Sequence, residues 1–381
     1  MRGRQPRRRG RIGRWGVGLV AGALLALGLT PLAAAPRAHA DFDDIFDPII
    51  DAIAQSVAAV DPSPTLTLDS GLDLSSIMAP ALAADATSAL AAEDLPENAI
   101  PLTMTAVTEP IINLSISGGS ELPILLDTGS NGLVVPWYQI GLDNLTFPTS
   151  FGIGAYSGGL QYFYVTLPEQ TVDFGHGIVS GPTSIDVELF AWPTTLQGWF
   201  LYPSFEAFLR PAEAVGVLGI ASDAVGPDDG PTTVISALPG DLSQGVLINE
   251  PGGYVQFGPD PLSGGVTVDG IANAVLNVQV GNGDKTLVNT IIDSGGVYGT
   301  IPQGALDQGG TIGQTLAPDQ LINVFTKDGQ TLLYSYTTTA TNSPTIVPDR
   351  QFMNTGFMPF NLGPIYIGYD PATTTFHSLP T

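Results

Sequence analysis

Apolar and polar positions follow the same pattern in two separate stretches of the chain. Residues 112–136 read INLSISGGSELPILLDTGSNGLVVP, and residues 276–302 read LNVQVGNGDKTLVNTIIDSGGVYGTIP. In each stretch an alternating strand passes through a Gly-rich turn into a second apolar strand, which ends in Asp-(Thr/Ser)-Gly at Asp127 and at Asp293. A proline follows each aspartate nine positions later. A strand–turn–strand unit that occurs twice predicts two related lobes around a pseudo-twofold axis.

The rest of the chain after residue 100 also favours strands. No long helical periodicity is present there, and the 46 glycines and 32 prolines of the chain divide its apolar runs into short pieces. We therefore predict an all-β, bilobal fold with a cleft between the lobes. The expected divisions are an N-terminal lobe over 100–240, inter-lobe strands over 241–260 and a C-terminal lobe over 261–381.

The first 40 residues have a different pattern. Residues 1–16 are basic, residues 17–35 are apolar, and Ala38-His39-Ala40 offers a small-x-small cleavage site before Asp41. This arrangement predicts a secretory signal peptide over 1–40, cleaved near Ala40/Asp41, and hence a secreted or cell-surface protein. An uncleaved membrane anchor is the alternative interpretation, and the cleavage site favours the signal peptide.

The segment 41–99 reads as a short helix followed by a linker. Residues 42–57 carry apolar side chains at helical spacing with aspartates in the early turns, which predicts an amphipathic helix. The remainder is rich in Ala and Pro, as linkers are. An inhibitory pro-segment would offer a cation to an acidic site, and residues 41–100 contain no Lys or Arg. We therefore expect the helix to pack on the β-domain or to bind a cell-envelope or exported protein.

Charge is distributed unevenly along the chain. Eight of the 12 basic residues lie in the first 40 positions, so the remainder carries 4 basic and 36 acidic residues and a formal charge of −32. Such a surface repels nucleic acids and anionic membranes, so both are poor partners and no nucleic acid is expected to bind. The acidity has two interpretations: it maintains solubility, or it adapts the protein to acid, where protonation relaxes the self-repulsion.

The scarcity of cysteine and histidine restricts the chemistry. The chain has no cysteine and three histidines, one of them in the leader, and it contains no HExxH motif. Disulfides, thiolate chemistry and zinc sites are therefore not expected, and neither is a metal or another cofactor. A Ser-His-Asp triad would have to use His176 in a predicted turn or His377 near the end of the chain. Carboxylate chemistry is what remains.

The two Asp-(Thr/Ser)-Gly motifs have the residue types that such chemistry needs. Gly129 and Gly295 let the backbone pass close to a carboxylate, and hydroxyls and N–H groups of the motifs are expected to hydrogen-bond the carboxylates. Two carboxylates within about 3 Å of each other share one proton, so one can take a proton from water while the other holds the scissile carbonyl. Two unrelated structural turns are the alternative interpretation. The predicted supporting side chains are Thr128, Ser130 and Ser294.

On these motifs the chain resembles the pepsin-type aspartic proteases over residues 100–381. It resembles more closely the secreted mycobacterial PE cleavage proteins, although the PE domain that usually precedes them is not evident here. Three further stretches carry the resemblance: a flap-like FGIGAYSG at 151–158, the strand AVGVLGI at 214–220, and the linking strands at 245–258. The resemblance implies a pepsin-like fold, catalytic Asp127 and Asp293, a flap hairpin near 150–178, and a monomer that acts on polypeptides, including exported cell-surface proteins.

The chain departs from the wider family around both catalytic loops. Gly296 stands where a Ser or Thr is usual, which predicts that one hydrogen bond to the second carboxylate is missing. The second apolar-apolar-Gly motif is ambiguous between residues 361–363 and the region of Gly356. Val134 replaces a Trp that often partners the flap tyrosine.

The flap itself, with Phe151, Gly152 and Tyr156, also differs from the family. Phe151 replaces the tyrosine that normally covers the substrate. Tyr156 and Trp137 are the candidates for the polar contact, and ordinary core or rim packing is the favoured alternative for both. Several aromatic residues are candidates for lining the substrate pocket: Phe147, Phe151, Tyr156, Tyr162, Trp192 and Trp199.

These observations predict a secreted aspartic endopeptidase and leave two alternatives open. One is a catalytically silent pepsin-like module that grips an extended peptide by strand addition, which Gly296 and Phe151 keep possible. The other is a cell-envelope interaction protein that acts through the helix at 42–57.

Overall fold

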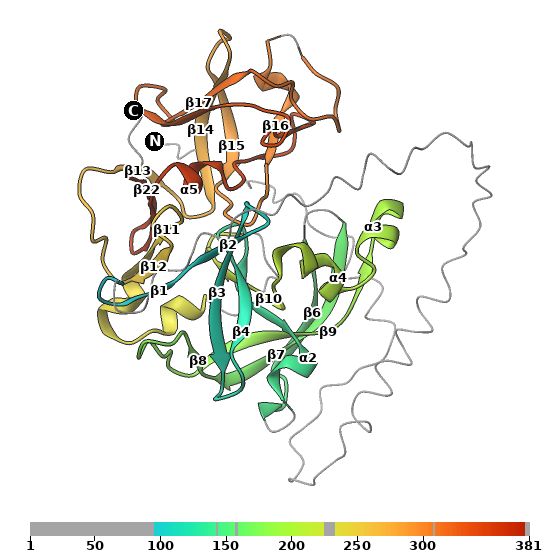
Figure 1. The fold of residues 1–381 in the computed structure, drawn as a ribbon, viewed down its shortest axis with the longest axis vertical. Helices are drawn as coiled ribbons and strands as arrows, with labels where there is room; N and C mark the ends of the chain where they lie inside the picture. Colours follow the sequence, from blue (N-terminus) through green and yellow to red (C-terminus); the bar gives the residue numbers. More distant parts are fainter. Residues whose placement is uncertain (1–94, 142–143, 157–158, 225–232, 308, 378–381) are drawn as a thin grey trace, which may run out of the picture. The chain divides into compact units, whose positions relative to one another are not determined.

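The computed structural model describes one compact unit of the chain, in which strands predominate and the helices are few and short (Figure 1). The all-β prediction is therefore confirmed. The predicted signal peptide, its cleavage site and the helix at 42–57 lie outside the described residues. Those residues are 95–141, 144–156, 159–224, 233–307 and 309–377.

A nine-stranded sheet forms the N-terminal lobe. Its core is the first repeated unit, in which β3 and β4 pair antiparallel with Ile111 opposite Leu125. The connecting turn includes Gly118 at φ 75°, a left-handed conformation that glycine adopts without steric cost. β4 is buried along almost its whole length because β3 and β10 flank it. In sheet order the strands are β2 (Thr103–Thr105), β3 (Glu109–Ile116), β4 (Leu122–Asp127), β10 (Gly216–Ile220), β5 (Asn131–Pro136), β9 (Thr183–Pro193), β7 (Leu160–Gln170) and β6 (Ser150–Tyr156), with β8 (Val172–Asp173) paired to β3.

A seven-stranded sheet forms the C-terminal lobe around the second repeated unit. There β14 and β15 pair antiparallel as β3 and β4 do, and β20 runs parallel to β15 as β10 runs parallel to β4. The two repeats of the sequence therefore occupy equivalent places in two sheets. In order the strands are β18 (Leu332–Thr337), β17 (Leu321–Phe325), β14 (Asn273–Val280), β15 (Thr286–Ile291), β20 (Met353–Asn354), β16 (Thr300–Pro302) and β19 (Thr345–Val347).

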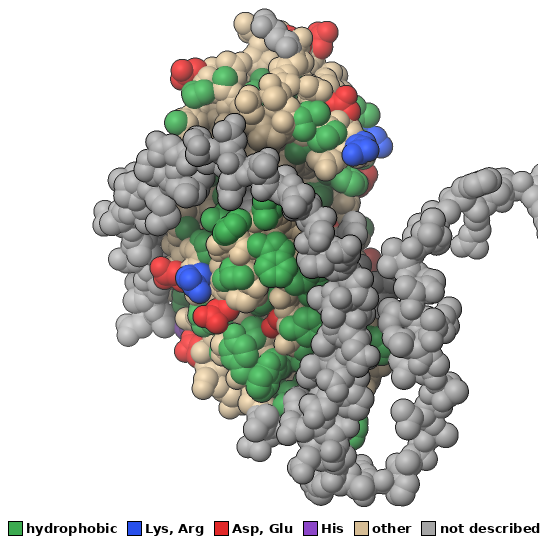
Figure 2. All heavy atoms as spheres, turned by 90° about the vertical axis from the view of Figure 1, so that its right-hand side faces the viewer, with side chains coloured by type: hydrophobic (Ala, Val, Ile, Leu, Met, Phe, Trp, Pro, Cys, Tyr) green, Lys and Arg blue, Asp and Glu red, His purple; other side chains and the backbone are tan. Residues whose placement is uncertain are grey.

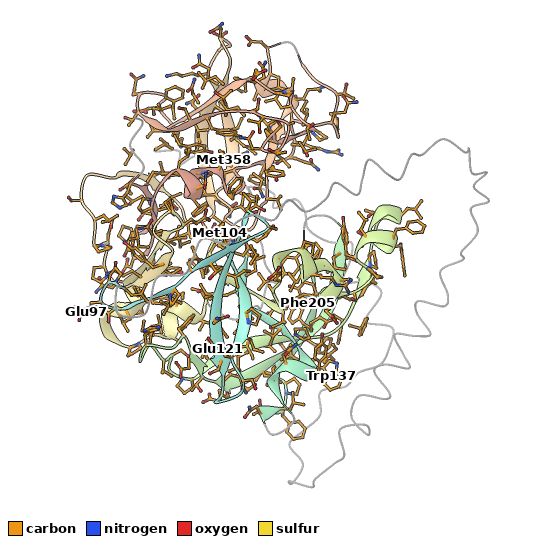
Figure 3. The ribbon with its side chains drawn as sticks, viewed as in Figure 1. Glu97, Met104, Glu121, Trp137, Phe205 and Met358 are labelled. Atoms are coloured by element: carbon orange, nitrogen blue, oxygen red, sulfur yellow. The ribbon has the colours of Figure 1, made fainter. Side chains whose placement is uncertain are left out.

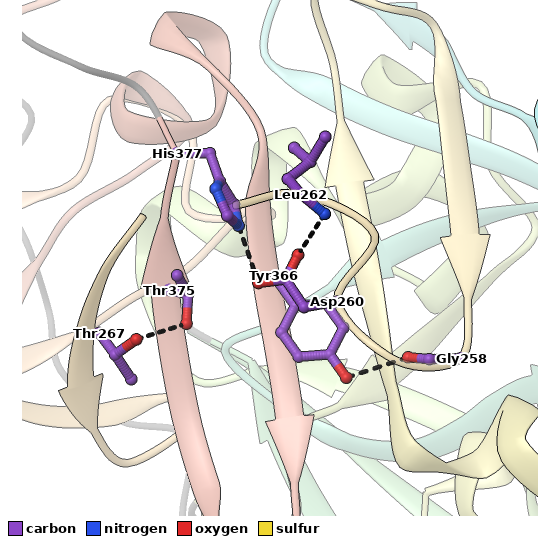
Figure 4. A network of polar contacts seen from close by, with 7 residues as sticks. All are labelled: Gly258, Asp260, Leu262, Thr267, Tyr366, Thr375 and His377. Carbon is purple, nitrogen blue, oxygen red and sulfur yellow. Dashed lines mark hydrogen bonds and ion pairs between the residues drawn. The ribbon is translucent and has the colours of Figure 1, made fainter. Parts of the chain in front are cut away.

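A six-stranded sheet combines segments from the start, middle and end of the described chain. The predicted inter-lobe region, 241–260, contributes two of its strands. At one side, His377 Nε2 lies 2.9 Å from Asp260 Oδ2, and the Tyr366 hydroxyl donates to the Gly258 carbonyl oxygen (3.0 Å) (Figure 4). His377 thus contacts an aspartate in the loop between β12 and β13. The strands are β1 (Ala99–Pro101), β12 (Tyr254–Phe257), β11 (Gly245–Asn249), β21 (Ile365–Tyr369), β22 (Ala372–Phe376) and β13 (Val266–Asp269).

The helices are short and lie between strands. Thr195 caps α3 by accepting from the Gly198 N–H (3.0 Å), and Ser204 caps α4 by accepting from the Ala207 N–H (3.2 Å). Figure 3 labels Trp137 on α2, Phe205 on α4 and Met358 on α5. Within the described ranges, no helix has the length and apolar character needed to span a bilayer. The α-helices are α2 (Trp137–Ile140), α3 (Leu196–Leu201), α4 (Phe205–Leu209) and α5 (Met358–Leu362); the 3-10 helices are η5 (Arg210–Ala212), η6 (Val234–Ala237), η7 (Gly240–Gln244) and η8 (Gln303–Ala305).

Candidate active site

The structure brings Asp127 and Asp293 together from equivalent positions of the two lobes. Asp127 is the last residue of β4, and Asp293 follows the end of β15 by two residues. Their carboxyl groups are in hydrogen-bond contact. Both residues are nearly buried, with 8% and 9% of their surface exposed. Two strands that end at the pseudo-twofold axis thus deliver the paired carboxyl groups that the repeated motif predicts.

The glycines of the two motifs make this approach possible. A Cβ atom on Gly129 would lie 2.5 Å from Asp293 Cγ, and one on Gly295 would lie 3.1 Å from Asp127 Oδ1. Each motif therefore leaves room for the carboxyl group of the other, and the space at Gly129 is the tighter one.

The hydroxyls of Thr128 and Ser294 tie the two loops together. Thr128 Oγ1 accepts from the Ser294 N–H (2.8 Å) and donates to the Ile292 carbonyl oxygen (2.8 Å). Ser294 Oγ reciprocates by accepting from the Thr128 N–H (3.1 Å) and donating to the Leu126 carbonyl oxygen (2.7 Å). We expected these hydroxyls to bond the carboxylates; they bond the backbone of the opposite loop instead, and both side chains are fully buried.

Each carboxyl group is held by a backbone donor and a side-chain donor. The Gly129 N–H donates to Asp127 Oδ1 (2.8 Å), and the Gly295 N–H donates to Asp293 Oδ1 (3.1 Å). Ser130 Oγ donates to Asp127 Oδ2. These bonds fix the plane of each carboxyl group, as the chemistry of a shared proton requires.

The hydrogen bond predicted to be missing beside Gly296 is supplied by another residue. Asn354 Nδ2 donates to Asp293 Oδ2, the atom equivalent to the one that Ser130 contacts on Asp127. Asn354 comes from β20, which pairs parallel with β15 so that Asn354 lies opposite Ile291. Sequence analysis missed Asn354 because it lies 61 positions beyond Asp293 along the chain.

The structure also locates the second apolar-apolar-Gly motif. Val217 on β10 lies opposite Leu125, two residues before Asp127, and Asn354 lies opposite Ile291, two residues before Asp293. The counterpart of Val217-Leu218-Gly219 is therefore Asn354-Thr355-Gly356, with polar residues where apolar ones were sought. The other candidate, residues 361–363, falls at the end of α5.

Burial and charge favour one proton shared by the dyad. Removal from water, followed by the neighbouring Asp127 charge, raises the pKa of Asp293 well above its ordinary value, while the donors on Asn354 and Gly295 act to lower it. Two carboxyl groups in contact in a buried site cannot both ionise readily. The pair therefore has the properties of a general acid and a general base held together.

The predicted flap is the antiparallel hairpin of β6 and β7. Gly152 lies opposite Tyr164 and Gly154 opposite Tyr162, and a Cβ on either glycine would overlap the tyrosine ring across from it. The glycines are thus covered by cross-strand aromatic rings. Phe151 lies on the other face of the strand, where it is 60% exposed and its ring centre is 6.0 Å from that of Phe163.

Tyr156, the polar flap residue, faces the aromatic core of the N-terminal lobe. Its ring stacks on Tyr162 at 5.2 Å and on Phe208 at 5.7 Å. Burial, with smaller contributions that include the Asp127 charge, raises the pKa of Tyr156, so the phenol lies within electrostatic reach of the dyad. Tyr162 and Val134 are buried in the same cluster. α4 completes it with Phe205, a contact that sequence analysis did not predict.

The other aromatic candidates lie away from this core. Trp137 is 38% exposed and meets Tyr138 edge-on at 5.9 Å. Phe147 and Trp199 are 75% and 59% exposed, and Trp192 packs on Phe190 at 5.6 Å. Hydrophobic side chains gather on the face of the molecule drawn in Figure 2.

Comparisons with known proteins found a matching family model and similar proteins. The family model of the PE-PGRS C-terminal aspartyl peptidase-like domain matches residues 98–376, which include both aspartates. Proteins named PE cleavage protein A from two strains of Mycobacterium tuberculosis are 41% identical over 295 residues, 73% of this chain and 51% of theirs. The protein of that name from Mycobacterium marinum is 41% identical over 289 residues, 72% of this chain and 51% of its own. The chain thus spans about half the length of these relatives.

Proposed function

The chain belongs to the family of PE-PGRS C-terminal aspartyl peptidase-like domains, and from this premise we propose that it is a secreted aspartic endopeptidase with a pepsin-like fold. One observation carries the proposal: Asp127 and Asp293 are joined in a buried, hydrogen-bonded pair whose environment favours a single shared proton. Both motifs that create the pair lie within the part of the chain that the family model matches.

The dyad would hydrolyse a peptide bond by direct attack of water. The ionised carboxylate takes a proton from water as the water oxygen bonds to the scissile carbonyl carbon, while the protonated carboxyl group donates to the carbonyl oxygen. The C–N bond then breaks as the leaving nitrogen takes a proton from the dyad, which returns to its singly protonated state. Asp127 and Asp293 are the residues that touch the reacting atoms, and the flap is the element proposed to cover the substrate.

The substrate class follows from the relatives rather than from the site. Their name refers to PE cleavage, and the predicted leader implies export of this chain. We therefore place its substrates among exported cell-surface polypeptides, with its own N-terminal region included. The enzyme would act as a monomer.

The proposal is tested by incubating the purified protein with a mixed unfolded-protein substrate at about pH 3.5, 5 and 7. New peptide termini should appear with the wild type and with neither Asp127→Asn nor Asp293→Asn. Activity should be higher at about pH 4–5 than at about pH 7.5, because the shared proton is lost as the pH rises. Asp269→Asn removes the same charge from an exposed strand position and serves as the matched control.

Two outcomes would count against the protease. Cleavage that survives in both Asn variants would locate the activity elsewhere. A folded wild type that is as inert as both variants at every pH would favour the silent peptide-binding module, and peptide capture would then be measured with the same three proteins.

A further inference from the structure

We propose that Asn354 is a positioning residue of the dyad: its side-chain amide donates to Asp293 Oδ2, holds that carboxyl group in its plane and stabilises its ionised form. This inference rests on the proposed aspartic endopeptidase and adds a residue that the Asp-Ser-Gly motif does not contain.

The orientation of the Asn354 amide is fixed by its neighbours. Its Oδ1 accepts from the Gly356 N–H (2.8 Å), so the nitrogen is the end that faces Asp293 Oδ2. Its backbone N–H donates to Thr300 Oγ1 (3.1 Å), and β20 lies between β15 and β16. An amide rotated by 180° would place two donors against each other at Gly356 and two acceptors at Asp293.

The Asn354 side chain fills the space that a side chain at position 296 would need. A Cβ atom on Gly296 would overlap Asn354 Oδ1 and lie 2.9 Å from Asp293 Oδ2. In the first lobe the equivalent positions hold Ser130, three residues after Asp127, and the apolar Val217. The donor to the Oδ2 atom has thus moved from the loop in the first lobe to the crossing strand in the second.

The Ser130 hydroxyl and the Asn354 amide differ in the protonation states of the carboxyl group that they can hydrogen-bond. The Ser130 hydroxyl can donate to an ionised carboxylate or turn and accept from a protonated one, whereas an amide nitrogen only donates. The Asn354 amide therefore favours the ionised form of Asp293, whereas Ser130 can hydrogen-bond Asp127 in either form. Asp127 is the titratable group whose charge acts on Asp293. The two carboxyl groups are therefore unequal.

Reciprocal substitution tests the inference through catalysis. Asn354→Val, which copies Val217, should lower kcat about 10- to 100-fold and move the acidic limb of the pH–rate profile up by about one pH unit, because a donor to the ionised form is lost. Gly296→Ser alone should be at least as impaired, since its side chain overlaps Asn354. Gly296→Ser combined with Asn354→Val should recover most of the rate and return the acidic limb toward its wild-type position. Asn289→Val, at an exposed position of β15, controls for a valine in the same sheet.

A second measurement does not depend on activity. With asparagine labelled by ¹⁵N in the full chain, the Asn354 side-chain amide protons should move with pH in step with titration of the dyad, and in Asp293→Asn this movement should disappear. An Asn354 amide that does not respond to pH overturns the inference. An active wild type whose pH profile is unchanged by Asn354→Val also overturns it, whereas a pH-responsive amide in an inert wild type would leave Asn354 in place and reject the peptidase.

Discussion

At the scale of single residues, the two motif glycines are equivalent in sequence but unequal in space. Neither has a left-handed φ, so alanine fits the backbone at both positions. A Cβ on Gly129 would meet the Asp293 carboxyl carbon at 2.5 Å, whereas one on Gly295 would approach Asp127 Oδ1 no closer than 3.1 Å. We expect Gly129→Ala to lower kcat/KM by about 100-fold, because it separates the carboxyl groups.

Gly295→Ala is the matched variant. We expect it to lower kcat/KM by about tenfold or less, because its Cβ would lie farther from the opposite carboxyl group. Steady-state kinetics beside circular dichroism of both proteins measures the difference. If both variants lose kcat/KM equally, the smaller space at Gly129 does not determine the spacing of the carboxyl groups.

The residues of the site differ in how far the sequence alone predicts their placement. Asp127 and Asp293 were predictable because each ends an apolar strand in a repeated local pattern. The role of Asn354 was not, because it depends on the register of two strands distant in the sequence, β15 and β20. Thr128 and Ser294 were identified, but their partners lie in the opposite loop.

At the scale of secondary-structure elements, strand patterning predicted one lobe better than the other. β10 has the apolar sequence GVLGI, which signals a buried strand. Its counterpart β20 has two residues, Met353 and Asn354, and too little apolar pattern to be recognised. The six-stranded sheet was recognised only in its middle strands, since pairing β11 with β21 joins segments more than 100 residues apart.

The loops that carry Asp127 and Asp293 are also elements joined by a testable contact. Thr128→Val keeps the shape of the side chain but leaves the Ser294 N–H and the Ile292 carbonyl oxygen without their buried partner. This should lower the free energy of unfolding by about 1–3 kcal/mol. Chemical denaturation measures the loss, and Thr128→Ser, which keeps the hydroxyl, should lose less. Equal destabilisation by both variants would mean that packing of the methyl group matters more than the hydrogen bonds.

At the scale of the whole molecule, the pH dependence of stability has two sources: the acidic surface and a set of buried carboxyl groups. Burial raises the pKa of Glu109, Asp186 and Glu188 to about 7 in each case. Burial and then the Glu109 charge raise the pKa of Glu250, whose carboxyl oxygens have no hydrogen-bond partner among the described residues. These groups are neutral in the folded protein at a pH where the unfolded chain has ionised them.

The sign of the effect on stability follows from this difference. Between about pH 4 and pH 7 unfolding releases protons, so the free energy of unfolding is greatest below about pH 4 and falls as the pH rises, by up to about 1.4 kcal/mol per pH unit for each group. Relaxation of the surface charge at low pH acts in the same direction. A fold that is more stable in acid than at neutral pH suits a dyad that needs its shared proton.

Asp186→Asn separates the buried contribution from the surface charge. Asp186 is 1% exposed and accepts from Thr166 Oγ1 at 2.7 Å, a bond that an amide oxygen can also accept. Denaturation curves between about pH 4 and pH 8 should therefore show a shallower loss of stability in Asp186→Asn than in the wild type. The exposed control Asp269→Asn should run parallel to the wild type. If Asp186→Asn also runs parallel, the buried carboxyl group does not set the pH dependence, and the acidic surface does.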